Sequence, residues 1–305
     1  MSEALLSYNL EEAVINLSKE EAIQFVTEVL EINPKKFGED RILFLNELIK
    51  AVHCSVPFQN ITLLCQPEAY RHVPTLKEIN TAVMGGYGGL CYTIGVFMTH
   101  LLEALGYEVY LSAGSINSSS SNNHVISIVQ NLTFPGSKHL VDAWSGWPTF
   151  EAIPLDFENE SPIYNHSYLE FKFVREGHTI LRIHWKGDKH LEASSCEYVV
   201  DGWIRVCELD LTPRNISFFD QSMTNVYTKP GVMSPFLVSF RAVVYRELKL
   251  VAIKDSTLLL ENDNHELEVT KFQTREEMSK TVSKYFPQFR VEDVTKAMDS
   301  LHLLE

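Results

Sequence analysis

The hydrophobic period of the 305-residue chain changes at Gly106, and this change most constrains how the chain can fold. Before Gly106, apolar residues recur at helical spacing, in the ranges 10–30, 42–49 and 94–105. After it, short apolar runs typical of strands follow one another, at 107–113, 125–129, 139–144, 168–174, 179–185 and 198–209. Helices followed by strands and then by mixed structure predict an α+β protein whose sheet is antiparallel or a small barrel.

Local signals add several element boundaries. Ser18 and Glu21 are spaced for a capping box, and Gly106 ends the helix that begins at Cys91. We expect an extended connection over 54–75, where three prolines occur, and a short helix over 76–83. We also expect a helix at 213–224, strands within 236–254 and 256–272, and a terminal helical segment over 274–304.

Charge and cysteine content exclude some classes of function. The net charge of -14 makes the chain a poor candidate for binding nucleic acid or an anionic membrane. The five cysteines match no zinc spacing, so we expect no metal site. The acidic N-terminal stretch is unlike a signal peptide and no apolar run is long enough to cross a bilayer, which predicts a cytoplasmic protein with free thiols.

Three residues could together form an activated thiol. Cys91 follows Gly88 and Gly89 at a helix start, where the helix dipole and free N–H groups favour a thiolate. His124 precedes an apolar strand, and Asp142 lies inside the apolar run HLVDAW, where a carboxylate is costly unless paired. Along the chain, Cys91 would be the nucleophile, His124 the base and Asp142 the carboxylate that orients the base. Taken singly, Cys91 also fits a buried structural cysteine and His124 a histidine at a loop end.

Four segments around these residues resemble, in order and spacing, the motifs of arylamine N-acetyltransferases. They are VPFQNI at 56–61, GGLCY at 88–92, HVISIV at 124–129 and LVDAWSG at 140–146. A fifth segment, NVYTKPGVMSPF at 225–236, resembles part of the third domain of that family. The resemblance covers nearly the whole chain, and the ordered set is more specific than any one motif.

The resemblance implies a fold and a reaction. It implies a helical first domain at 1–90, an antiparallel β-barrel second domain at 91–210 and an α/β third domain, acting as a lid, at 211–305. The first two resemble the core of papain-like cysteine proteases. In ping-pong chemistry, acetyl-CoA would acylate Cys91 and an aromatic amine or hydrazine would then take the acetyl group. His124 would pair with Cys91, Asp142 would hold His124, and backbone N–H groups near Cys91 would stabilise the oxyanion.

The resemblance also assigns contacts with both substrates. It places Ser120, Ser121 and Tyr227 against CoA, and Phe58, Asn123 and Ser145 against the acceptor. Ser121 stands where relatives often carry Gly. A solvated loop accounts nearly as well for Ser120 and Ser121, and core packing accounts for Phe58.

Four positions depart from the family pattern. Tyr87 replaces an Arg, Gln59 replaces a Glu, and Gly95 replaces an Asn, at positions that cluster beside the triad in relatives. Losing one partner of a buried ion pair costs roughly 3–5 kcal/mol, so the joint loss of both charges indicates a coherent substitution. Trp144 stands where relatives carry Gly, and we expect it to narrow or reshape the acceptor cleft.

Three functions therefore remain open, with the acetyltransferase placed first. The second is a binding module that keeps the fold but is catalytically impaired, because the Arg, Glu and Asn are lost. The third is a cysteine hydrolase or transamidase that uses the same three residues, since fold does not fix function.

Overall fold

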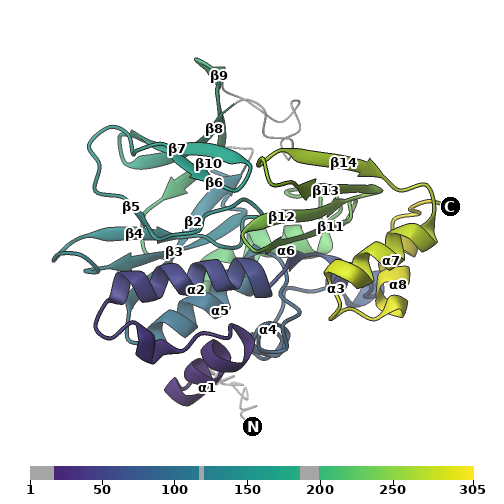
Figure 1. Ribbon diagram of the computed structural model, residues 1–305, viewed down its shortest axis with the longest axis horizontal. Helices are drawn as coiled ribbons and strands as arrows, with labels where there is room; N and C mark the ends of the chain where they lie inside the picture. The colour runs from purple at the N-terminus through teal and green to yellow at the C-terminus, as the bar shows by residue number, and fades with distance from the viewer. Residues whose placement is uncertain (1–16, 117–119, 186–198) are drawn as a thin grey trace, which may run out of the picture.

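A computed structural model describes residues 17–116, 120–185 and 199–305 (Figure 1). The start of the first expected helix, Cys196 and the first residue of the strand expected from 198 lie outside the described residues. The α-helices are α1 (Lys19–Gln24), α2 (Arg41–Ser55), α3 (Ile61–Leu64), α4 (Leu76–Met84), α5 (Cys91–Ala104), α6 (Asp220–Thr228), α7 (Arg275–Tyr285) and α8 (Val291–Asp299). Shorter turns are the π-helix η1 (Phe25–Val29) and the 3-10 helices η2 (Pro34–Lys36), η3 (Glu68–Tyr70) and η5 (Ile216–Phe219).

The described strands form two antiparallel sheets. One runs in the order β5-β4-β3-β2-β10-β8-β7-β6, with β9 also paired to β10, and the other runs β1-β11-β12-β13-β14. The bounds in the first sheet are β2 (Glu108–Ile116), β3 (His124–Gln130), β4 (Lys138–Val141), β5 (Ile153–Pro154), β6 (Tyr164–His166), β7 (Leu169–Glu176), β8 (Thr179–Trp185), β9 (Val199–Val200) and β10 (Trp203–Asp210). Those in the second are β1 (Phe58–Gln59), β11 (Arg241–Arg246), β12 (Lys249–Lys254), β13 (Thr257–Glu261) and β14 (Leu267–Lys271).

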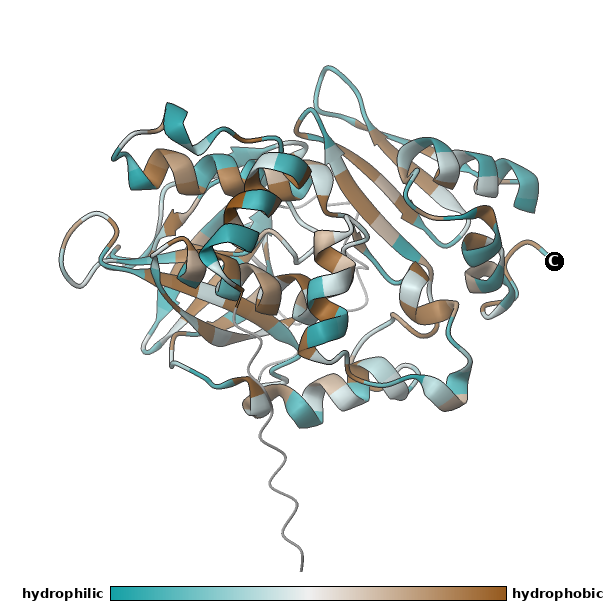
Figure 2. Cartoon of the chain, turned by 90° about the horizontal axis from the view of Figure 1, so that it is seen from below, coloured by the Kyte–Doolittle hydropathy of each residue, from teal (hydrophilic) through white to brown (hydrophobic). Residues whose placement is uncertain are grey.

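The mixed fold of helices and curled antiparallel sheet confirms the α+β prediction. The end strands β5 and β6 are not paired with each other in the described part of the chain, so hydrogen bonds there do not close the expected barrel. Figure 1 shows α2 and α5 along one side of the larger sheet, and α7 and α8 beside the smaller one. In Figure 2 the strands are mostly brown, whereas teal gathers on the outer turns of the helices, as expected for elements that bury one face. The division into domains at residues 90 and 210 stays a prediction.

Helix α5 lies at the centre of the largest hydrophobic core. Ile94, Phe97 and Leu101 are fully buried among residues of α1, α2, α4, β2 and β3. Phe97 packs edge-on against Phe25, with ring centroids 4.8 Å apart. Gly106 adopts a φ of 80° just after the helix, as the sequence predicts for a helix end. A helix with most of its residues buried, all of them from Cys91 to Thr99, is a rigid support for the residue at its first position.

The extended connection expected over 54–75 is wrong in part. Helix α2 continues to Ser55, and α3 forms at Ile61–Leu64. The buried Asn60 side chain explains the turn: it donates to the carbonyl oxygens of Phe236 and Ser239 at 2.7 Å each, and accepts from the Arg241 amide at 2.8 Å. These partners are distant in sequence, so local propensity did not reveal them.

The terminal helical segment is two helices, α7 and α8. Phe286, which precedes Pro287, leaves the helical region with φ -129° and ψ 62°. The residue before a proline is disfavoured in the α region, so the break follows from the sequence although the apolar period continues across it.

Replacing Asn60 by Ala should destabilise the protein by roughly 3 kcal/mol, because three buried backbone groups lose their partner. Urea unfolding would measure the change. As a matched control, Asn165→Ala removes an exposed amide from β6 and should alter stability by no more than about 0.5 kcal/mol. Equal effects of the two variants would contradict the role given to Asn60.

Candidate active site

The turn before α5 places Cys91 at the first position of that helix. Gly88 has a φ of 65°, and a Cβ built there would lie 2.0 Å from the Pro57 carbonyl oxygen. The Gly89 amide donates to that oxygen at 3.2 Å, and the Gln59 amide donates to the Gly89 oxygen at 3.0 Å. Only glycine fits this approach of backbone to backbone. The turn is therefore fastened to β1, and Cys91 lies where the N–H groups of the first helical turn converge.

The register of β3 and β4 brings His124 and Asp142 together. Ser127 lies opposite Val141 in this antiparallel pair, so the start of β3 adjoins the end of β4. Nε2 of His124 lies 3.1 Å from Oδ1 of Asp142, and both side chains are buried. On the adjacent β2, a Cβ at Gly114 would lie 3.0 Å from the His124 ring. Gly114 thus leaves the space that the imidazole occupies.

Cys91 lies beside this pair. Its buried thiol is 3.8 Å from the backbone oxygen of Asn123, the residue before His124. The second ring nitrogen of His124, Nδ1, has no hydrogen-bond partner among the described residues, yet the Cys91 side chain is near enough to affect the proton affinity of the ring. The structure therefore brings together the three residues that the sequence singled out.

Electrostatics favour charged forms of His124 and Asp142. Burial by itself lowers the pKa of His124, but the Asp142 carboxylate and the Cys91 side chain outweigh it and raise that pKa to about 10. Burial opposes ionisation of Asp142, whereas His124, Arg182 and the Trp144 amide favour it, and together they hold the pKa of Asp142 below its ordinary value. An imidazolium next to an ionised carboxylate is the state that stabilises a neighbouring thiolate.

Trp144 packs in the protein interior, and the expectation that it narrows or reshapes the acceptor cleft stays a prediction. It is fully buried, and its indole N–H donates to the Val125 oxygen of β3 at 2.5 Å. A Cβ added at Gly95 would lie 2.7 Å from the same indole nitrogen. The indole ring therefore occupies the space that a side chain at position 95 would need. Gly95 and Trp144, which both depart from the family pattern, thus form one packing contact between α5 and the loop that carries Asp142.

The loss of charge at positions 59 and 87 leaves no buried group of these two residues unsatisfied. Gln59 is fully buried, and its amide nitrogen donates to Thr62 Oγ1 and to the Tyr87 oxygen at 3.1 Å each. Its amide oxygen accepts from the Thr62 amide at 3.1 Å. The Tyr87 side chain is partly exposed and packs on Phe289, with ring centroids 5.9 Å apart. A neutral network thus replaces the pair expected in relatives.

The residues predicted to contact substrates lie at different depths. Phe58 packs edge-on against Phe236 and beside Gly146, whereas the Oγ atom of Ser145 is buried without a hydrogen-bond partner among the described residues. The side-chain oxygen of Asn123 accepts from the backbone N–H of Ile116 at 2.8 Å, and its side-chain nitrogen donates to the backbone oxygen of Met233 at 3.0 Å. The Asn123 side chain is therefore already hydrogen-bonded to backbone groups. Ser120 is exposed with a φ of 58°, and Ser121 is half-buried.

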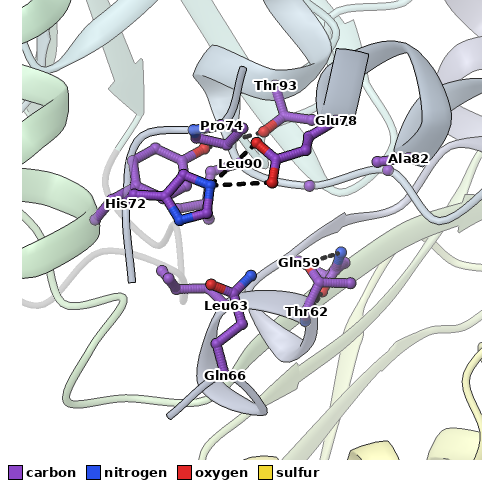
Figure 3. Close-up of a pocket in the computed structure, with 13 residues that line it drawn as sticks. Gln59, Thr62, Leu63, Gln66, His72, Pro74, Glu78, Ala82, Leu90 and Thr93 are labelled. Carbon is purple, nitrogen blue, oxygen red and sulfur yellow. Dashed lines mark hydrogen bonds and ion pairs between the residues drawn. The ribbon is translucent and has the colours of Figure 1, made fainter. Parts of the chain in front are cut away.

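Tyr227 is buried beside the start of α5. Its hydroxyl lies 3.0 Å from Thr93 Oγ1, and burial raises the pKa of the phenol. Tyr227 and Thr93 are among the residues that line a cavity of about 150 Å³, which Figure 3 shows with Thr93 labelled. In Figure 3, His72 and Glu78 approach each other on one side of the cavity, at 3.0 Å, with Gln59 and Thr62 on the other. Cys91 is not among the lining residues, so this cavity adjoins the thiol without exposing it.

Sequence reasoning missed several residues that shape the site. Gly114 and Thr93 carry no local signal, because their roles come from partners on other elements. Arg182 did have a signal, since it interrupts the apolar run TILRIHW as Asp142 interrupts HLVDAW. No described helix is both long and apolar enough to span a bilayer. Within the described ranges, no three His, Cys, Asp or Glu side chains are grouped in a way that could hold a metal ion.

Comparison with known proteins gives a family match and a partial match to a curated relative. A family model described as N-acetyltransferase matches residues 42–293. The N-malonyltransferase FDB2 of Gibberella moniliformis is 25% identical over 114 residues, which is 35% of this chain and only about a third (33%) of that relative's length.

Solved structures share the fold over nearly the whole chain. Arylamine N-acetyltransferase of Mycobacterium marinum superposes with a TM-score of 0.73 at 15% identity, over 92% of this chain and 99% of that one. The same enzyme in complex with CoA gives 0.72 at 15% identity, over 90% and 97%. The enzyme of Nocardia farcinica gives 0.73 at 16%, over 94% and 98%.

Gly95 and Trp144 should be energetically coupled. Gly95→Ala alone should cost roughly 1–3 kcal/mol through overpacking, partly offset by the better helix propensity of Ala. In combination with Trp144→Phe, which removes the nearest indole atoms, the cost should be at least about 1 kcal/mol less than the sum of the two single changes. Urea unfolding of the four proteins measures this coupling.

Gly95→Ala combined with Trp203→Phe is the control, because Trp203 packs on Trp185 and not on Gly95. The effects of these two substitutions on stability should be additive. Additivity at 95 and 144 would contradict the contact.

The buried imidazole should make stability depend on alkaline pH. Because the pKa of His124 is raised from 6.5 to about 10, its stabilising effect is complete below pH 6.5 and is lost as the pH rises towards 10. The loss should be at most about 1.4 kcal/mol per pH unit. Unfolding should be compared in Cys91→Ala and Cys91→Ala/His124→Gln, a background without the Cys91 thiol, in which Asp142 alone raises the pKa of His124 and the alkaline window is narrower. The alkaline slope should be smaller in the double variant. The exposed His178→Gln should leave it unchanged, and an equal slope in the first two proteins would refute the assignment.

Proposed function

The chain belongs to the N-acetyltransferase family, and from that membership we propose that it transfers an acyl group from an acyl-CoA thioester to an aromatic amine or hydrazine. The observation that carries the proposal is the buried His124–Asp142 contact beside the thiol of Cys91 at the start of α5. A binding module would gain nothing from keeping two ionisable groups buried and paired, since such burial is costly.

In the first half-reaction, Cys91 is the nucleophile. Its thiolate attacks the carbonyl carbon of the acyl-CoA thioester, and N–H groups of the first α5 turn stabilise the oxyanion. As the tetrahedral intermediate collapses, the bond between carbon and the CoA sulfur breaks. The proton of the His124 imidazolium goes to the departing CoA thiolate, which leaves an acylated Cys91 and a neutral His124.

In the second half-reaction, the amine nitrogen attacks the carbonyl carbon of the acyl-cysteine. Neutral His124 accepts a proton from the amine, and the Cys91 thiolate leaves. Asp142 fixes the orientation of the ring and stabilises the imidazolium that forms again. The cycle thus returns the thiolate–imidazolium pair with which it began.

For the substrate contacts, we propose that Ser120, Ser121 and Tyr227 lie along the path of CoA, and that Phe58, Asn123 and Ser145 border the acceptor. The M. marinum enzyme in complex with CoA, which shares this fold, supports CoA as the carrier. For Asn123 we propose an indirect contribution, because its amide joins Ile116 to Met233 and its own backbone oxygen contacts the Cys91 thiol.

Acetyl is the first acyl group to test, because the family model is described as N-acetyltransferase. The partial match to an N-malonyltransferase supports malonyl as the second. The two acyl groups differ by a carboxylate, so a site that prefers one should discriminate clearly against the other.

The purified protein, mixed briefly with acetyl-CoA or malonyl-CoA and no acceptor, should gain one acyl group in intact-mass spectrometry. Cys91→Ala should gain none. Addition of an arylamine should discharge the acyl group within the same experiment, whereas Cys91→Ala with the same amine reports any uncatalysed transfer.

Cys207→Ala is a matched control, because it removes a second buried thiol to which the proposal gives no part in acyl transfer. It should be acylated like the wild type. If neither acetyl-CoA nor malonyl-CoA labels the wild type, the transferase proposal is rejected and the hydrolase or binding-module alternatives are favoured.

A further inference from the structure

A buried cation lies beneath the loop that carries Asp142. Arg182 is 1% exposed, and its guanidinium donates three hydrogen bonds. They run from Nη1 to Thr149 Oγ1 at 2.7 Å, from Nη2 to the Pro148 oxygen at 3.1 Å and from Nε to His184 Nε2 at 2.9 Å. Two of the three partners belong to the loop after β4. Arg182 thus holds the far end of the loop that begins at Asp142.

The strand pattern explains why an arginine points inward here. In β8, alternate residues share a face, so Arg182 points to the same side as Ile180 and His184. On the neighbouring β7, Phe173 and Phe171 lie opposite Arg182 and His184. The guanidinium carbon is 4.4 Å from the centre of the Phe171 ring, a cation–π contact that offsets part of the cost of burial.

Among the anionic groups around Arg182, Asp142 most strongly favours the charged guanidinium. Burial lowers the pKa of Arg182, and of the charged groups that oppose this, Asp142 has the largest effect. Tyr168, Tyr245 and Cys207 also face the guanidinium. Burial raises the pKa of Cys207, so at neutral pH it contributes no negative charge. An arginine remains protonated in such a setting because its intrinsic pKa is far above neutral.

The other groups that face Asp142 do not supply a constant positive charge. His53, from α2, is buried, and burial lowers its pKa to about 3, so it is neutral. His184 accepts the Arg182 hydrogen bond at Nε2, so that nitrogen carries no proton. His124 is a cation only for part of the proposed reaction, since it gives its proton to the leaving CoA thiolate. Cys207 is neutral, as above.

The sum of the buried charges shows what Arg182 contributes. With Cys91 as thiolate and His124 as imidazolium, the four groups Cys91, His124, Asp142 and Arg182 are neutral in total. With Cys91 acylated and His124 neutral, Asp142 and Arg182 are again neutral in total. Without the arginine, the acyl-enzyme would hold a buried carboxylate with no counter-charge, which is strongly disfavoured.

We propose that Arg182 is a positioning residue for acyl transfer, which keeps Asp142 ionised during the part of the cycle when His124 is neutral and anchors the 142–150 loop through Pro148 and Thr149. The catalytic consequence rests on the proposed function. The electrostatic part does not, and it can be tested in protein that cannot turn over.

The test uses protein in which iodoacetamide has converted Cys91 to a neutral thioether, as acylation would. Histidine NMR then follows the titration of His124, with His124→Gln to assign its signal. Removing the positive charge by Arg182→Met should make His124 about tenfold easier to protonate, a rise of about one pKa unit. The pKa of His124 should rise because the positive charge of Arg182 repels the proton that His124 takes up, and the methionine does not. An unchanged titration would overturn the proposal.

Two further variants separate charge from anchoring. Thr149→Val removes one hydrogen bond to Arg182 and keeps the charge, so the titration of His124 should not move. A shift equal to that of Arg182→Met would mean that Arg182 acts only by holding the loop. Arg182→Lys keeps the charge but loses the planar fork, and should titrate like the wild type while unfolding at lower urea concentration.

If Arg182→Met fails to fold, Arg182→Lys still tests the proposal. A raised His124 pKa in Arg182→Lys, which keeps the positive charge, would show that this charge does not set the pKa of His124. None of these measurements uses an acyl-CoA. A titration that shifts as expected in a protein that acetyl-CoA and malonyl-CoA fail to label would leave the electrostatic role standing and reject only the transferase proposal.

Discussion

The burial of one carboxylate is the constraint on which the rest of this structure depends. Asp142 lies in a dry interior, so it must be met by positive charge and by hydrogen-bond donors. His124 reaches it at 3.1 Å from the adjoining strand, and the Trp144 amide and Arg182 add to its stabilisation. The strand register, the glycine at 114 and the buried first half of α5 all serve to hold these groups where their charges offset each other. The nucleophilic role proposed for Cys91 therefore depends on a charge arrangement that folding itself requires.

The positions where this chain departs from its family are explained by packing with neutral partners. Gln59 forms a closed set of hydrogen bonds with Thr62 and the Tyr87 backbone, which leaves no charge beside the turn that precedes Cys91. Trp144 occupies the space over Gly95 and ties the Asp142 loop to α5 and β3. The positive charges that favour ionised Asp142 come from His124 and Arg182.

The sequence predicted the order of helices and strands, the capping box at Ser18, and the three residues that meet at the start of α5. Those predictions succeeded because they rest on local periodicity and on polar residues in apolar runs. It did not predict α3, which depends on Asn60 binding a segment about 180 residues away, or the break at Pro287, which the apolar period conceals. It did not reveal that Gly95 is the packing partner of Trp144, because that contact joins two elements that are distant in sequence. Arg182 was overlooked although it carries the same signal as Asp142, a charged residue within a buried strand.

The structure predicts that the protein holds His124 as an imidazolium next to the ionised carboxylate of Asp142. The most direct measurement is histidine nitrogen NMR of the resting protein at neutral pH, with the His124 signal identified by its loss in His124→Gln. Because Asp142 and Cys91 raise the pKa of His124 to about 10, both ring nitrogens should have the chemical shifts of a protonated imidazolium. A neutral ring with one protonated and one bare nitrogen would contradict the account, since the thiol beside it would then have no cation to stabilise its ionised form.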